Sequence, residues 1–226
     1  MNSRDAILAS VRKNLPRPAV LLPPLPESNG KRVVSTLEYK EHFTSFPEVQ
    51  HSSGDKELLP SFQKQLEAMG GRWFAVADAA GVRAKVTALF PDAKVVCSAV
   101  PEVPGNRRVE GISDPHELND VDVGVVRSPL AVAEAGGIWL TQSELVVNAL
   151  GVLAQHLIVL LEPSAVVPTL HEAYERIGLG ASPYGLFMAG PSATGDIEGV
   201  IIHGAQGARS LTVLLVPPQA NGKGAA

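Results

Sequence analysis

Residues 189–216, AGPSATGDIEGVIIHGAQGARSLTVLLV, concentrate hydroxyls, acids and glycines before a closing apolar stretch. Ser192 or Thr194 is suited to cap a short helix, with Asp196 and Glu198 in its first turn, where carboxylates favour the positive end of the helix dipole. Alternatively, the hydroxyls and backbone N–H groups of this helix start bind an anionic ligand, which the two acids would repel unless they point away or pair with a cation. The residues leave capping and ligand binding open.

The same segment lacks the standard signatures of nucleotide binding, serine hydrolysis and metal binding. No G-x-x-x-x-G-K-[ST] loop is present, and GPSAT differs from the G-x-S-x-G elbow because Thr194 replaces the second glycine. The six histidines of the chain form no metal-ligand array, so we expect no metal site. His203 is close enough in sequence to Asp196 and Glu198 to face the same pocket, although such a histidine is more often a surface or packing residue.

A second candidate is Glu134, in the stretch SPLAVAEAGG of residues 128–137. The sequence places it at the end of a very short helix-like turn, among small apolar residues and before two glycines. A carboxylate there is either paired or raised in pKa, and a raised pKa suits a general acid–base or nucleophilic role. The alternative is a structural carboxylate that accepts hydrogen bonds from backbone N–H groups or from Arg127. Both interpretations remain open.

Alternating helical and strand-like stretches must position these residues. Several strand candidates are continuous apolar runs, which is typical of strands that are covered on both faces. This predicts a three-layer α/β fold with a largely parallel sheet flanked by helices, and ligands then gather outside the carboxyl ends of the strands. The start of the predicted short helix, with Asp196, and Glu134 are therefore expected to rim one pocket at this carboxyl edge. The predicted strands are 72–78, 93–100, 122–128, 136–142, 156–162, 184–190 and 210–216, and the predicted helices are 37–45, 55–69, 80–89 and 168–178.

The composition of the chain excludes several classes of function. The chain has 226 residues, a net charge of −4 and 45% hydrophobic residues, which fits one well-cored domain and disfavours nucleic acid as a partner. Cys97 is the only cysteine, and an iron–sulfur cluster normally needs about four cysteine ligands. Any such cluster must therefore lie on a partner protein. No apolar run reaches the roughly 18 residues of a membrane span.

The ends of the chain predict two appendages. Residues 1–15 have the apolar spacing of an amphipathic helix, and PRPAVLLPPLP carries five prolines in eleven residues. We therefore predict a helix and proline-rich linker at 1–35, an α/β domain at 36–217 and a disordered tail at 218–226. The N-terminus lacks the features of a signal peptide, so the expected location is the cytoplasm. A helix on such a linker suits contact with another subunit, for example in a homo-oligomer, or it folds back onto its own domain, and the sequence leaves both open.

Three stretches together resemble a known family. SPLAVAEAGGIWL, HLIVLLEPSAVVPTLHEA and MAGPSATGDIEGVIIHGAQGARSLTVLLV occur in this order and are similar to the LUD domain of the LutC/YkgG lactate-utilisation family. The resemblance implies a fold related to the superfamily of sugar isomerases, CoA transferases and formyltetrahydrofolate cyclo-ligases. It directs functional interest to Glu134, Ser192, Thr194, Asp196, Glu198, His203 and Gly204.

Two functions follow as hypotheses. The resemblance implies a subunit of a lactate-utilisation system that supports oxidation of L-lactate to pyruvate beside iron–sulfur partner proteins, without itself holding a cofactor. The alternative is a stand-alone enzyme that acts on a small phosphorylated or CoA-linked substrate, with Glu134 as base or nucleophile. A purely structural scaffold is a third interpretation, so the sequence does not decide whether this chain is an enzyme.

Overall fold

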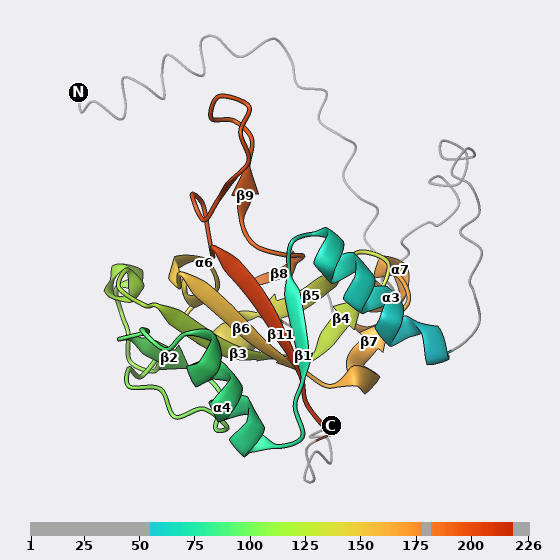
Figure 1. The fold of residues 1–226 in the computed structure, drawn as a ribbon, viewed down its shortest axis with the longest axis horizontal. Helices are drawn as coiled ribbons and strands as arrows, with labels where there is room; N and C mark the ends of the chain where they lie inside the picture. The colour runs from blue at the N-terminus through green and yellow to red at the C-terminus, as the bar shows by residue number, and fades with distance from the viewer. Residues whose placement is uncertain (1–54, 178–181, 219–226) are drawn as a thin grey trace, which may run out of the picture. The chain divides into compact units, whose positions relative to one another are not determined.

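A parallel five-stranded sheet forms the centre of the fold (Figure 1). The computed structural model describes residues 55–177 and 182–218. The strands are β1 (Arg72–Ala75), β2 (Val96–Ser98), β3 (Val123–Ser128), β6 (His156–Leu161) and β11 (Ser210–Leu215), in the spatial order β1-β11-β6-β3-β2. All neighbouring pairs are parallel. The predicted α/β fold with a largely parallel sheet is confirmed.

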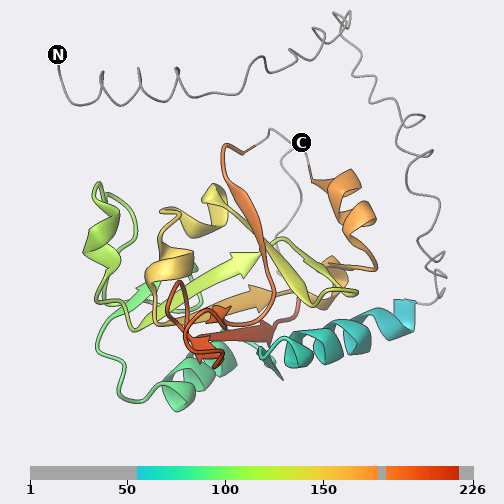
Figure 2. The same ribbon diagram turned by 90° about the horizontal axis from the view of Figure 1, so that it is seen from above.

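Helices cover both faces of this sheet, because its strands are apolar on both faces. Helix α4 (Ala79–Leu89) begins at Asp78, whose side chain accepts the Gly81 N–H, and buries Val82 and Val86 against one face. Helix α3 (Asp55–Ala68) contributes Phe62 and Leu66 to the core on the other face. Figure 2 shows α4 on one side of the sheet, with a second sheet on the other.

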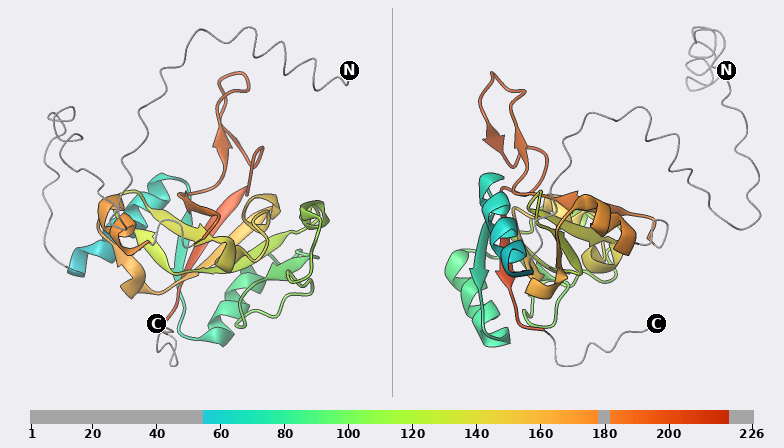
Figure 3. Two further views of the ribbon diagram at one scale, coloured as in Figure 1. Left: turned by 180° about the vertical axis from the view of Figure 1, so that it is seen from behind. Right: turned by 90° about the vertical axis from the view of Figure 1, so that its right-hand side faces the viewer.

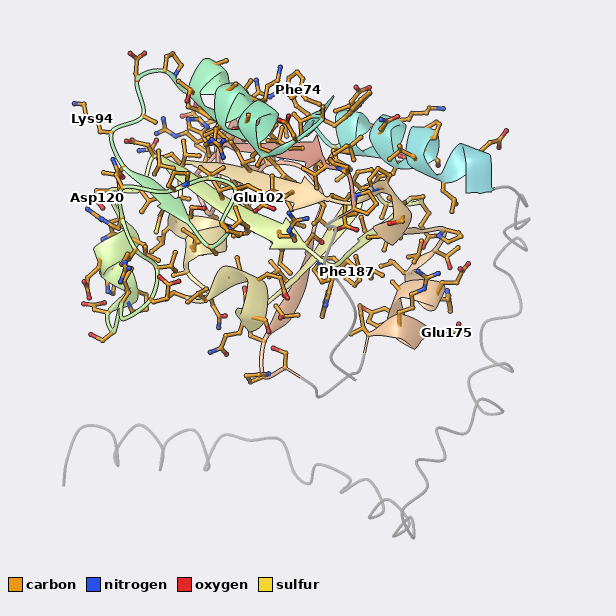
Figure 4. The ribbon with its side chains drawn as sticks, turned by 90° about the horizontal axis from the view of Figure 1, so that it is seen from below. Phe74, Lys94, Glu102, Asp120, Glu175 and Phe187 are labelled. Atoms are coloured by element: carbon orange, nitrogen blue, oxygen red, sulfur yellow. The ribbon has the colours of Figure 1, made fainter. Side chains whose placement is uncertain are left out.

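The second sheet was not anticipated. It has the order β7-β4-β5-β8, from β7 (Val166–Val167), β4 (Leu130–Val132), β5 (Gly137–Thr141) and β8 (Gly185–Met188). β4 is parallel to β7 and antiparallel to β5, which is antiparallel to β8. The outer face carries α7 (Leu170–Arg176), so four layers follow one another in Figure 3, from α4 to α7, where three were predicted. The additional layer is the second sheet. Figure 4 labels Phe187 of β8 and Glu175 of α7 on the side of the domain away from Lys94 and Asp120.

Short elements complete the described chain. They are η1 (Pro115–Leu118), α5 (Gln142–Leu145), α6 (Leu150–Leu153) and η2 (Pro163–Ala165). α5 begins at a capping box, in which Thr141 Oγ1 accepts the Ser143 N–H and Glu144 Oε2 accepts the Thr141 N–H at 2.8 Å. Within the described residues, no helix is long and apolar enough to cross a membrane.

Residues 193–203 form a hairpin rather than a helix. Its strands are β9 (Ala193–Thr194) and β10 (Ile202–His203), which pair antiparallel. Figures 1 and 3 show the hairpin extending away from the sheets. The predicted helix start at Ser192 and Thr194 is therefore wrong. The predicted elements at 1–35 and 37–45, and residues 219–226 of the predicted tail, lie outside the described residues.

Candidate functional site

Glu134 lies in the turn between β4 and β5, and it holds the segment that leads into α7. Its backbone N–H donates to the Pro168 carbonyl at 3.1 Å, and its Oε1 accepts the Leu170 N–H at 2.6 Å. The helix-like turn predicted for this stretch is wrong, because Leu130–Val132 is strand β4. The sequence suggested backbone N–H groups or Arg127 as hydrogen-bond partners of this carboxylate, and in the structure its partner is a backbone N–H. The side chain nevertheless remains exposed at the surface.

The turn that carries Glu134 packs tightly on α3. Gly136 has a φ of +60°, and a Cβ atom on it would clash with the backbone of Gln65 and Leu66. A residue with a side chain would be strained in this conformation and would also push α3 away. Gly136 therefore fixes the position of Glu134 relative to the core.

The polar side chains of the hairpin divide into two groups. Thr194 Oγ1 accepts the Asp196 N–H at 3.3 Å and so stabilises the hairpin turn. This turn continues through Glu198, with a φ of 54°, and Gly199, with a φ of +70°. The side chains of Asp196, Glu198 and His203 are exposed, and within the described residues they form no hydrogen bond or ion pair. They are available to a ligand or another molecule.

Ser192 and Gly204 meet at the base of the hairpin. The Gly204 N–H donates to the Ser192 carbonyl at 3.0 Å, and the Ser192 N–H donates to the Ala208 carbonyl at 2.9 Å. Gly204 has a φ of +85°, and a side chain there would collide with Arg209. The structure thus brings Ser192 and Gly204 together through their backbones.

A cavity of about 450 Å³ opens beside this base. It is lined by residues 204–207 and Arg209, by Asn119, and by residues 152–155. Gln155 and Arg209 immediately precede β6 and β11, and the Arg209 N–H donates to the Gln155 carbonyl at 2.8 Å. The cavity therefore lies at the amino ends of these strands. This cavity is therefore not the pocket predicted at the carboxyl edge of the sheet, which stays a prediction.

Glu134 is not joined to the hairpin by any hydrogen bond or ion pair within residues 55–177 and 182–218. Its bonded partners are Pro168 and Leu170, whereas the hairpin is bonded at Ser192 and Gly204. A single pocket rimmed by Glu134 and Asp196 thus remains a prediction. The roles of all seven candidate residues also remain predictions.

The carboxyl end of β3 carries a charged cluster that the sequence analysis did not select. Arg127 Nη2 donates to Glu102, and Arg127 Nη1 lies 3.6 Å from Glu162 Oε1. A cavity of about 190 Å³ beside Arg127 is also lined by Ser143 and Glu144. The signal was an arginine inside the apolar run of residues 122–128. Because its guanidinium pairs with two carboxylates, its positive charge is compensated within the domain.

Two ionisable groups lie near the amino ends of the parallel strands. His156 Nδ1 lies 2.8 Å from Ser210 Oγ, and its ring stacks on Phe90. Burial, followed by the charges of Arg209 and Arg72, lowers the pKa of His156. Hydrogen bonds from the N–H groups of Val95 and Lys94 lower the pKa of Asp122.

The residues present do not fit an iron–sulfur cluster. Cys97 is fully buried in β2, and burial raises the pKa of its thiol. A cluster needs about four thiolates, and this chain has one cysteine. Within the described ranges, no three potential metal-binding side chains come together.

Comparison with known proteins finds a domain family and a solved structure that are similar to this chain. Residues 113–216 match the LUD domain, a range that includes all seven candidate residues. A crystal structure of a DUF162 family protein from Deinococcus radiodurans is similar to this chain, with 19% identity and a TM-score of 0.59, over 73% of this chain and 99% of that one. No curated protein matches the chain. The similarity in structure supports the same fold, and the sequence match shows that residues 113–216 are similar to the LUD domain.

Proposed function

We propose that this protein is a cytoplasmic subunit of a lactate-utilisation system, which supports the oxidation of L-lactate to pyruvate by iron–sulfur partner proteins. The observation that carries the proposal is the LUD domain over residues 113–216, since LUD domains are associated with lactate utilisation. The match includes both the Glu134 turn and the hairpin. The similar Deinococcus radiodurans structure supports the fold of this subunit.

The proposed division of labour follows from the chemistry of the reaction. Oxidation of the lactate hydroxyl to the pyruvate carbonyl releases two electrons and two protons. The single buried Cys97 of this chain is unsuited to bind a cluster that would accept those electrons. In the proposal, the electrons therefore pass to clusters on the partners, and this subunit supports their activity through its exposed polar loops.

Copurification tests this proposal. The full chain with an affinity tag is expressed at its native level in lactate-grown cells, and captured proteins are assayed for iron, acid-labile sulfide and lactate-dependent reduction of a dye. We expect cysteine-rich, cluster-bearing partners, and we expect deletion of the gene to abolish growth on lactate but not on pyruvate. Capture of no such partner, together with normal growth of the deletion strain on lactate, would refute the proposal.

The exposed carboxylate of Glu134 favours a second candidate, a stand-alone enzyme for a small phosphorylated or CoA-linked substrate. The hydrogen bond from Leu170 holds the carboxylate in one orientation at the surface, as a general base or nucleophile requires. A panel of such substrates is assayed with the wild-type protein and with Glu134→Gln, which keeps an oxygen acceptor for Leu170. Turnover that the substitution abolishes supports this candidate, whereas unchanged turnover excludes a role for the carboxylate.

A further inference from the structure

The hairpin exposes an apolar tip. Ile197, Val200 and Ile201 have exposed fractions of 50%, 60% and 62%. The hairpin of residues 193–203, which we call the arm, carries these side chains away from both sheets (Figure 3). Exposed large hydrophobic side chains that gather in one place mark an interaction surface rather than an ordinary surface.

The arm has few interactions of its own. β9 and β10 have two residues each and form a separate two-stranded sheet. Such an isolated hairpin is marginally stable in water, and three or more strands or packing against another element are normally needed. Packing of the arm against a further protein surface would therefore stabilise it.

The base of the same arm offers a complementary surface. The cavity of about 450 Å³ begins at Gly204, one residue after β10, and includes the apolar side chains of Val152 and Leu153. Val152 has an exposed fraction of 38%, and Arg209 adds an exposed positive charge. The arm tip combines apolar groups with the acids Asp196 and Glu198. Tip and base are thus complementary in both polarity and charge.

We propose that the arm binds a second copy of this chain, with the tip of each arm seated in the cavity at the base of the other. In this arrangement the two arms lie side by side and antiparallel, related by a two-fold axis that passes between their midpoints. With this two-fold symmetry the assembly is complete as a dimer, because each copy inserts one tip into its partner and binds the tip of its partner in its own cavity. The apolar tips are then covered, and Asp196 and Glu198 face Arg209 of the other copy.

A second copy fits better than an unrelated protein because both complementary surfaces belong to one chain, at the two ends of one element. The arrangement also adds to the candidate site. Each cavity, lined in its own chain by Gly204 and Arg209, receives Asp196 and Glu198 from the other copy. Residues of the hairpin motif that lie apart in one chain would thus form one pocket across the dimer. This inference does not depend on the proposed role in lactate oxidation.

The first test is sedimentation of the full chain over a range of concentrations. We expect a dimer of about twice 23.8 kDa for the wild type. Ile201→Asp puts a charge into the apolar contact and should raise the dissociation constant by at least about tenfold, as is typical of a central interface residue. The matched control is Tyr174→Asp, which changes an exposed aromatic residue on α7 and should leave the dimer unchanged. A monomer at every concentration, or equal effects of the two variants, would overturn the inference.

Two further variants test which surfaces meet. Arg209→Glu should weaken the dimer, and the double variant Glu198→Arg, Arg209→Glu should restore it, because the opposite charges are exchanged between tip and base. Glu198→Cys with Gln206→Cys, in one chain, should form a covalent dimer on mild oxidation, while the buried Cys97 does not react. A dimer that shows neither charge rescue nor this crosslink uses another surface. A monomer that binds a different protein through its arm would also contradict the inference.

Discussion

Replacement of Glu134 separates a structural role from a chemical one. Glu134→Ala removes the acceptor that holds the Leu170 N–H at 2.6 Å, at the first residue of α7. A hydrogen bond to a charged group contributes about 1.5–3 kcal/mol, and a helix cap about 1 kcal/mol. Because Glu134 is exposed and water can replace the lost acceptor, we expect a loss of about 1 kcal/mol in the free energy of unfolding. For a domain of this size this corresponds to about 2–4 °C in Tm.

Thermal and urea unfolding of the wild type, Glu134→Ala and Glu134→Gln measure this effect. Glu134→Gln keeps an oxygen acceptor but loses the charge. Its loss in the free energy of unfolding should therefore be less than half of the loss in Glu134→Ala. Hydrogen exchange of the Leu170 amide should be faster in Glu134→Ala and close to normal in Glu134→Gln. Equal stability of Glu134→Ala and the wild type would refute the structural role, as would equal losses for both variants.

Three further predictions concern stability. Gly136→Ala should lower the free energy of unfolding by about 2–4 kcal/mol in urea titrations, because its Cβ meets the backbone of α3 at positive φ. Gly111→Ala is the control, with a φ of +85° and open space around the Cβ, and should cost only about 1 kcal/mol; similar losses would argue against the clash. Asp122→Ala removes the acceptor for two backbone N–H groups and should lower the free energy of unfolding by about 1–2 kcal/mol, with a smaller loss for Asp122→Asn; unchanged stability of Asp122→Ala would contradict this role. Because the pKa of His156 is lowered in the folded state, the unfolded state binds the additional proton, so the free energy of unfolding should fall as pH drops below about 6.5. Chemical unfolding measures the difference between the free energies of unfolding at pH 8 and pH 5.5, and this difference should be smaller for His156→Gln than for the wild type. An equal difference in both proteins would assign the pH dependence to other groups.

The parallel sheet could be predicted because its signal is local. Continuous apolar runs such as residues 156–161 can only be buried on both faces, and the intervening helical stretches imply parallel connections. The second sheet gave a weaker signal. β4 has three residues and β7 has two, which is too short for a clear local pattern, and the two strands pair with each other although they lie far apart in the sequence.

The hairpin motif was misinterpreted because one set of residues serves two local structures. A hydroxyl that accepts the N–H of the residue two positions later occurs both at helix starts and in turns. Here Thr194 Oγ1 accepts the Asp196 N–H within a turn. The two structures differ at Glu198 and Gly199, which both have a positive φ that a helix does not allow. In the sequence, only the glycine indicates such a conformation. The cluster at Arg127 was missed because its partners, Glu102 and Glu162, lie far away in the chain.

The buried Cys97 leaves the folded chain without an accessible thiol. Its thiol is fully buried on the edge strand β2, and its raised pKa favours the protonated form, so thiol reagents can modify it only when this part of the core opens. The rate of modification in the native protein therefore reports how often the core opens, without an added label. A protected thiol also gives the chain no route to an intermolecular disulfide while it stays folded.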